Sequence, residues 1–183
     1  MIDEVLKMIK GINAVVEERK SEIDNISQCF QIQESLTGLG HSIVDVDNHA
    51  RREFKAQFIF LLKRESQQRQ FFVFSDLMIV ANTHWIVKHV VAMKGVEMQF
   101  SGKNVNTNKR RKSQMDLFEF SLKWGQNPKP EIFISDDQRQ IIRFQEIIAG
   151  QLEKIKADEV IVEDEEAEAE EAEDDLDEEM IID

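Results

Sequence analysis

Residues 54–80 read FKAQFIFLLKRESQQRQFFVFSDLMIV, and this stretch decides the fold. Between residues 54 and 62 Phe, Ala or Leu occupies every second position, and this period of two is typical of a strand with one buried face. The polar run 63–68 then predicts a turn. A second strand follows at residues 70–74, and Ser75-Asp76 offers a bend before a third strand at residues 77–80. Strands joined by such short connections pair antiparallel.

The remaining sequence up to Lys156 predicts four more strands and a helix. The strand-like runs are residues 85–91, 96–100, 117–122 and 131–134. Ser135-Asp136-Asp137 provides side chains suited to a helix N-cap, and the helix is expected to run to about Lys156. Its apolar face consists of Ile141, Phe144, Ile148, Leu152 and Ile155. These elements predict an α+β fold, a small seven-stranded antiparallel barrel capped by its C-terminal helix, with Phe144 as the plug.

The first 36 residues predict one long amphipathic helix. They contain no Pro and a single Gly, Gly11, and the helix is expected to end at the glycine-containing cluster 37–40. A helix of this length is about 50 Å long, more than the barrel can cover. We therefore expect its apolar stripe to pack against protein outside the barrel. The stripe consists of Ile2, Val5, Ile9, Ile12, Val16, Ile23, Ile26 and Phe30.

The net charge of −13 conceals two parts of opposite sign. Of the 36 acidic residues, 16 lie between Asp158 and Asp183, so the preceding part holds 20 acidic and 23 basic residues, a balance of about +3. The acidic segment is of low complexity and has little apolar surface, which predicts disorder or at most a transient helix. The expected organisation is a helix over residues 1–38, a linker over 39–52, the barrel over 53–156 and a disordered acidic tail over 157–183.

Several classes of function lack the residues they need. Cys29 is the single cysteine, so it cannot form an internal disulfide, and no His or Cys lies near it at the spacing of a zinc site. The four His share no spacing, there is no glycine-rich phosphate loop, and no cofactor or metal is expected. No apolar run reaches the length of a membrane span, and the first residues lack a signal-peptide pattern. A soluble cytosolic or nuclear protein is expected.

Two strings resemble a known family. QFFVFSDLMIV at residues 70–80 is similar to the second and third strands of the pleckstrin-homology domain in Rho-family guanine-nucleotide exchange factors. Ile12-Asn13, followed by IQESLTGL at residues 32–39, is similar to the end of the last Dbl-homology helix that precedes this domain in the same family. The resemblance extends from Met1 to about Lys156. One departure is Phe144, because the family usually has a Trp at this place.

The resemblance implies a C-terminal regulatory part of an exchange factor that binds membrane or partner protein. Its expected partner is a Rho-family small GTPase, and Asn13 matches the Asn that bonds the GTPase switch region in this family. Only the last helix of the catalytic Dbl-homology bundle fits before Gly40. No exchange activity is therefore expected from this chain alone, and neither the GTPase nor a phosphoinositide can be named.

Basic residues near the first turn imply weak binding to anionic lipid and a peripheral membrane location in the cytoplasm. Lipid-binding relatives place paired cations there around an inositol phosphate, but this chain reads Gln67-Gln68-Arg69-Gln70, so one expected cation is missing. A basic run at 109–112 could reinforce the attraction, or serve as a nuclear-localisation signal. No nucleic acid is expected as partner. The expected lipid-binding residues are Lys63, Arg64, Arg69, Lys109, Arg110, Arg111 and Lys112.

Two other functions fit the same sequence. A non-catalytic adaptor would dimerise through the heptad-like stripe of the first helix. A nuclear chaperone with a pleckstrin-like fold would use the acidic tail to engage basic proteins. We also hypothesise that the tail folds over the basic run 109–112 at low salt and weakens attachment to membranes.

Overall fold

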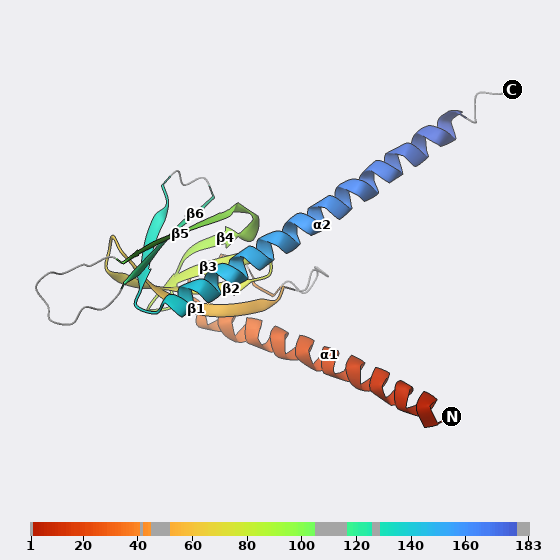
Figure 1. Cartoon of the computed structure of the whole chain (residues 1–183), viewed down its shortest axis with the longest axis horizontal. Helices are drawn as coiled ribbons and strands as arrows, with labels where there is room; N and C mark the ends of the chain where they lie inside the picture. Colours follow the sequence, from red (N-terminus) through yellow and green to blue (C-terminus); the bar gives the residue numbers. More distant parts are fainter. Residues whose placement is uncertain (1, 41, 45–51, 105–116, 126–128, 179–183) are drawn as a thin grey trace, which may run out of the picture.

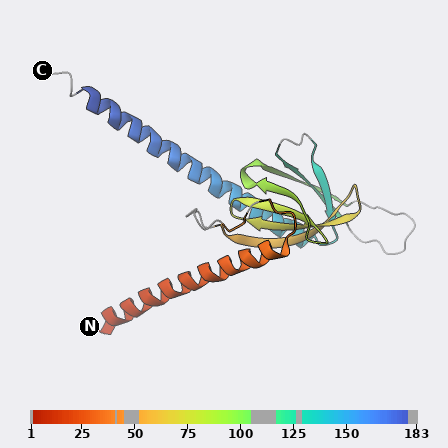
Figure 2. The same ribbon diagram turned by 180° about the vertical axis from the view of Figure 1, so that it is seen from behind.

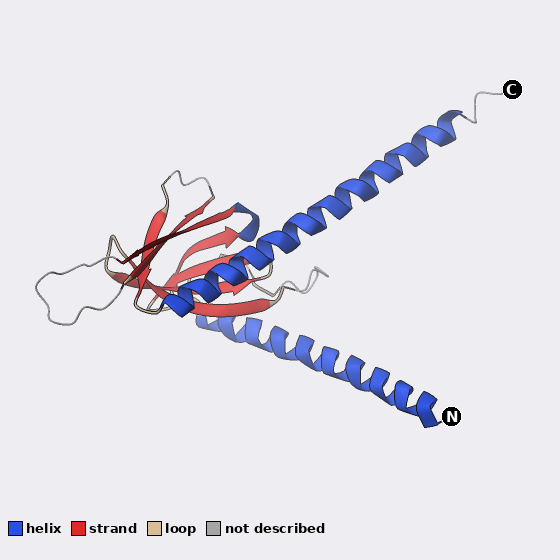
Figure 3. Cartoon of the chain, viewed as in Figure 1, coloured by secondary structure: helices blue, strands red, loops and turns tan. Residues whose placement is uncertain are grey.

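The computed structural model describes residues 2–40, 42–44, 52–104, 117–125 and 129–178, with side chains omitted at 102–104 and 159–178. Its fold is the predicted one, a long N-terminal helix, seven antiparallel strands and a C-terminal helix (Figure 3). The helices are α1 (Ile2–Ser35) and α2 (Gln138–Glu178), with a short 3-10 helix η1 (Met93–Gly95). The strands are β1 (Phe54–Leu62), β2 (Gln67–Phe74), β3 (Leu77–Asn82), β4 (Val87–Ala92), β5 (Val96–Asn104), β6 (Phe118–Trp124) and β7 (Glu131–Ser135).

The strands form one strongly bent sheet in the order β4-β3-β2-β1-β7-β6-β5. β1 pairs with β2 along almost its whole length, but it pairs with β7 only at Leu61↔Ile134 and Leu62↔Phe133. β1 is therefore the strand at which the sheet turns. The two parts of the sheet fold over a common core.

Phenylalanines fill this core, and α2 closes it. Phe71 of β2 and Phe133 of β7 are fully buried and meet edge to face, with ring centroids 5.1 Å apart. The first part of α2 packs against β1, β7 and η1, and it buries Ile141, Phe144 and Ile148. The predicted apolar face of this helix is thus confirmed. Its N-terminus is capped as expected, because Asp137 Oδ1 accepts hydrogen bonds from the backbone N–H groups of Arg139 (2.9 Å) and Gln140 (3.3 Å).

Both helices extend beyond the barrel on the same side and diverge from each other (Figures 1 and 2). Among the residues that the structure describes, only the C-terminal end of α1 packs on the barrel, so most of the apolar stripe is uncovered there, as predicted. The stripe is wider than predicted over the first 16 residues. The exposed apolar side chains of α1 are Ile2, Val5, Leu6, Met8, Ile9, Ile12, Val15, Val16, Ile23, Ile26 and Phe30. Neither α1 nor α2, within the residues described, has a segment long and apolar enough to span a bilayer.

The acidic segment differs from the disorder expected of it, because α2 continues through it as far as Glu178. Glu and Ala, which make up about half of this segment, are good helix formers, and neither Gly nor Pro follows Gly150. Intrinsic helix propensity thus continues an element that packing against the barrel has already started. Residues 179–183 lie outside the described part of the chain.

Candidate functional site

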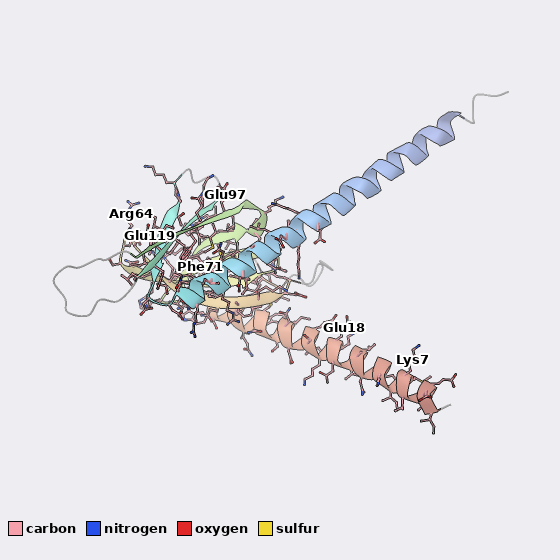
Figure 4. All side chains as sticks on the ribbon, viewed as in Figure 1. Lys7, Glu18, Arg64, Phe71, Glu97 and Glu119 are labelled. Carbon is pink, nitrogen blue, oxygen red and sulfur yellow. The ribbon has the colours of Figure 1, made fainter. Side chains whose placement is uncertain are left out.

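The N-terminal half of α1 is a projecting surface on which apolar and polar groups alternate. Asn13 is exposed, and its neighbours one turn away on the helix are the exposed Ile9 and Val16. The amide therefore lies beside the apolar stripe. In Figure 4 Lys7 and Glu18 point away from this part of α1, well removed from the barrel. A partner that covered the stripe would bring its own polar groups within reach of Asn13.

The C-terminal end of α1 is anchored on the outer face of the sheet. Cys29, Ile32 and Leu36 pack there in a second buried cluster that includes Phe72 and Phe74 of β2. Because Phe71 and Val73 point into the barrel while their neighbours Phe72 and Phe74 point toward α1, this strand is buried on both faces. Double coverage explains the uninterrupted apolar run QFFVF.

Burial also determines the chemistry of the single thiol. Cys29 is only 2% exposed, and desolvation raises the pKa of its thiol above the ordinary value. Its Sγ lies 3.9 Å from the carbonyl oxygen of Arg52. A neutral, shielded thiol is a poor nucleophile, so Cys29 is a packing residue.

Polar contacts surround this apolar anchor. The Asn25 side chain donates to the Arg52 carbonyl oxygen (3.0 Å) and accepts from the Phe54 N–H (2.8 Å). The Arg52 guanidinium binds both carboxylate oxygens of Asp76 at 2.7 Å and also donates to the Ile43 carbonyl oxygen (2.6 Å). The Gln33 Oε1 accepts from the N–H of Ile43 (2.6 Å). These contacts fold the chain that follows α1 back against the start of β1.

A second attachment lies at the turn between β3 and β4. The Thr37 N–H donates to the Trp85 carbonyl oxygen (2.9 Å), and the Thr37 carbonyl oxygen accepts from the Val87 N–H (2.9 Å). Trp85 has a φ of 60°, in the left-handed region, and its ring packs on Phe72 with centroids 5.3 Å apart. This turn conformation is the reason that β4 begins at Val87 and not at Trp85 as the sequence predicts.

The basic residues predicted for lipid binding are not brought together as a free cluster. Lys63 forms an ion pair with Glu119 of β6, and Arg69 is 7% exposed and paired with Glu65 at 2.6 Å. Arg64 lies with Glu119 at the end of the barrel away from the projecting helices (Figure 4). Residues 109–112 lie outside the described part of the chain. Two of the three predicted cations around the first turn are therefore balanced within the fold.

A cavity of about 460 Å³ lies beside these residues, between the β1–β2 turn and the beginning of β7. Three cationic and two acidic side chains contribute to its lining, and one of the cations, Lys63, is also paired with Glu119. The lining residues are Leu62, Lys63, Arg64, Glu65, Lys129, Pro130, Glu131 and Ile132. Within the residues described, no group of His, Cys, Asp and Glu side chains could hold a metal ion.

Sequence reasoning does not find the residues of the anchor. Asn25 occupies a polar position of a helical pattern, and its partners are backbone groups 27 and 29 residues away. The sequence marks Asp76 only as part of a bend. No spacing in the sequence connects these positions, because the link depends on where the end of α1 meets the sheet.

Known structures share this arrangement of helix and barrel. The fold is similar to autoinhibited Vav1, with a TM-score of 0.59, 13% identity and coverage of 80% of this chain and 26% of that one. It is also similar to an activated truncation of Vav1, with a TM-score of 0.53, 12% identity and coverage of 70% and 32%. A third structure holds human RhoA, its inhibitor and the DH/PH domain of human ARHGEF11, with a TM-score of 0.51, 12% identity and coverage of 79% and 44%.

The likeness concerns the fold. No protein-family model and no curated protein matches the sequence. The chain spans between about a quarter and less than half of the length of these solved chains. It therefore has a fold similar to part of these structures, one of which is the DH/PH domain of human ARHGEF11.

Proposed function

We propose that this chain is the C-terminal regulatory part of a Rho guanine-nucleotide exchange factor, in which the barrel presents α1 to a Rho-family GTPase. The observation that carries the proposal is a helix with eleven exposed large apolar side chains, which within the described residues packs on the barrel through its C-terminal end alone. The likeness to DH/PH folds supports the same reading, as do the strings around Asn13 and in β2 and β3.

A helix surface that binds a GTPase needs no catalytic residue of its own. Nucleotide exchange needs no nucleophile; it needs polar groups that rearrange the GTPase loops around the phosphates and Mg²⁺. Asn13 supplies a donor and an acceptor on a rigid helix, next to apolar side chains that could exclude water from the contact. Since the bulk of a Dbl-homology bundle is missing from this chain, it would bind a GTPase without accelerating nucleotide release.

Binding to nucleotide-free GTPases tests the proposal. The full chain is expected to bind at least one member of a Rho-family panel that includes RhoA, measured by calorimetry, without accelerating release of a fluorescent nucleotide. Asn13→Ala should weaken binding about tenfold, the equivalent of one good hydrogen bond. Gln28→Ala, which removes another exposed amide of α1, should have no effect.

Two results would contradict it. One is the absence of binding across the whole panel. The other is an equal loss of GTPase affinity in the Asn13→Ala and Gln28→Ala variants. Sedimentation of the same samples addresses the adaptor alternative. A stable dimer that binds no GTPase would favour dimerisation through the stripe of α1.

The cavity at the β1–β2 turn favours a second role, weak attachment to anionic membranes. Lys63, Arg64 and Lys129 line it, and each cation near an anionic surface contributes about 1 kcal/mol of attraction. Lys63→Glu combined with Arg64→Glu is therefore expected to lower binding to phosphatidylserine vesicles at low salt at least tenfold, measured by co-sedimentation. Lys88→Glu combined with Lys94→Glu, two exposed positions elsewhere on the barrel, changes the net charge by the same amount and is the control for charge alone. Unsubstituted chain that remains in the supernatant would refute this role.

A further inference from the structure

The contact between Asn25 and the beginning of β1 copies the hydrogen bonding of a paired strand. The backbone N–H and carbonyl of Glu53 face Ser75, with Glu53 O accepting from the Ser75 N–H (2.8 Å) and Glu53 N–H donating to Ser75 Oγ (3.1 Å). The flanking groups, Arg52 O and Phe54 N–H, point the other way, and the Asn25 amide bonds both of them. One side-chain amide thus takes the place of a residue in a neighbouring strand.

The contact between Thr37 and the β3–β4 turn repeats this pattern with backbone groups. Thr37 forms a parallel bridge with Ile86, bonding the carbonyl of Trp85 on one side and the N–H of Val87 on the other. The turn itself is fixed by Asn82, whose Oδ1 accepts from the N–H groups of His84 (3.0 Å) and Ile86 (2.9 Å). The second bridge is therefore attached to a preorganised hairpin.

The two bridges are separated by most of the anchored part of the helix. Ser35 follows Asn25 by ten positions in the helix, which corresponds to about 15 Å along the axis. Cys29 and Ile32 are buried between the bridges, and Leu36 lies next to the second one. Apolar packing alone has no direction and would allow the helix to pivot, whereas two directional contacts at separate points define the direction of the axis.

We propose that the Asn25 side chain, as a positioning residue, and the backbone bridge at Thr37 together fix the direction of α1, so that the exposed part of α1 and the barrel move as one rigid body. A partner on the exposed stripe would then be held at a set orientation to the barrel. We call the contact of α1 with the barrel, from Asn25 to Thr37, the joint. That the joint orients a Rho-family GTPase rests on the proposed function. The direction of the helix itself does not depend on any partner.

The clamp around Arg52 explains why the strand side of the first bridge stays in place. Arg52 is held by both oxygens of Asp76 and by the Ile43 carbonyl, so the carbonyl that Asn25 bonds belongs to a fixed residue. Loss of the Asn25 amide would leave this clamp intact. We therefore expect its removal to let α1 pivot on its remaining contacts without unfolding the barrel.

Distance measurements in the full chain test the proposal. Spin labels at Lys10→Cys on α1 and Lys88→Cys on β4 report the helix direction by double electron–electron resonance, since both positions are exposed. Native Cys29 is buried, and labelling of the chain without added cysteines measures its background. The unaltered joint should give a narrow distance distribution, and Asn25→Ala should at least double its width with little change in the thermal unfolding midpoint.

Three further variants separate positioning from general stability. Asn25→Asp keeps an acceptor for Phe54 N–H but loses the donor to Arg52 O, so it should broaden the distribution as alanine does. Gln28→Ala and Glu53→Ala remove neighbouring side chains but leave both bridges intact, so their distributions should stay narrow. A narrow distribution in Asn25→Ala, or equal broadening in the controls, would overturn the proposal. A failure to bind GTPases would leave this result unchanged, so the two proposals can fail separately.

Discussion

Phe144→Ala is expected to lower the free energy of unfolding by about 3–5 kcal/mol, which is the cost of truncating a fully buried Phe in a core that cannot collapse. The side chain is fully buried and forms the contact between α2 and the aromatic core. Its ring centroid lies 5.0 Å from that of Phe58 and 5.1 Å from that of Phe60, with Phe71 and Phe120 at 5.5 and 5.7 Å. Alanine would leave a cavity that strands on several sides of the barrel cannot close.

Urea denaturation measures this loss. Trp124 is 7% exposed and stacks against Phe133 of the same core, so its fluorescence reports the barrel. Phe144→Leu should lose less than Phe144→Ala, because it fills part of the cavity. Ile142→Ala changes a neighbouring side chain that is 41% exposed, and it should cost less than 1 kcal/mol, roughly the limit for a partly exposed site. A Phe144→Ala variant as stable as Ile142→Ala would show that α2 does not plug the barrel.

Ile32→Asp is expected to detach the end of α1 from the sheet while the barrel remains folded. Ile32 is 8% exposed, in the cluster between α1 and the outer face of β2 and β3. Loss of the apolar side chain and burial of an unpaired carboxylate would together oppose docking by at least about 3 kcal/mol. Detachment avoids that cost, since water then solvates the carboxylate.

Hydrogen exchange and fluorescence distinguish detachment from unfolding. The backbone N–H of Phe54, protected by Asn25, should exchange faster, and Trp85 emission should change because its ring packs on Phe72 in the same cluster. Amides of β6 and β7 should stay protected. Ile26→Asp, on the same helix but at a side chain 44% exposed, is the matched control and should leave the joint in place. Loss of protection throughout the sheet would mean that the barrel cannot fold without α1.

The barrel is predictable from the sequence because its signals are local. Alternation in residues 54–62 places Phe58, Phe60 and Leu62 inside and leaves Ile59 outside, as the structure shows. The spacing of Ile141, Phe144 and Ile148 likewise identifies the buried face of α2. Periodicity in a sequence indicates which face of an element is buried, and both β1 and the first part of α2 have one face in the core.

Other parts depend on contacts that periodicity does not record. The order of charged residues in the sequence does not show that Lys63 pairs with Glu119, 56 residues away. Nor does it show that Arg69 is buried against Glu65. The amide of Asn25 meets backbone groups, which every sequence possesses, so no residue type marks its partners. Lack of apolar surface predicts disorder in the acidic segment, although the helix that precedes it can propagate without further packing.

The burial of β2 on both faces has a consequence for the barrel alone. Without residues 2–44, Phe72, Phe74 and Ile79 would form an exposed apolar patch on the outer face of the sheet. Such patches drive proteins to aggregate or to recruit a substitute cover. The end of α1 therefore covers an apolar surface that we expect to make the isolated barrel prone to aggregation, in addition to holding the base of the projecting helix.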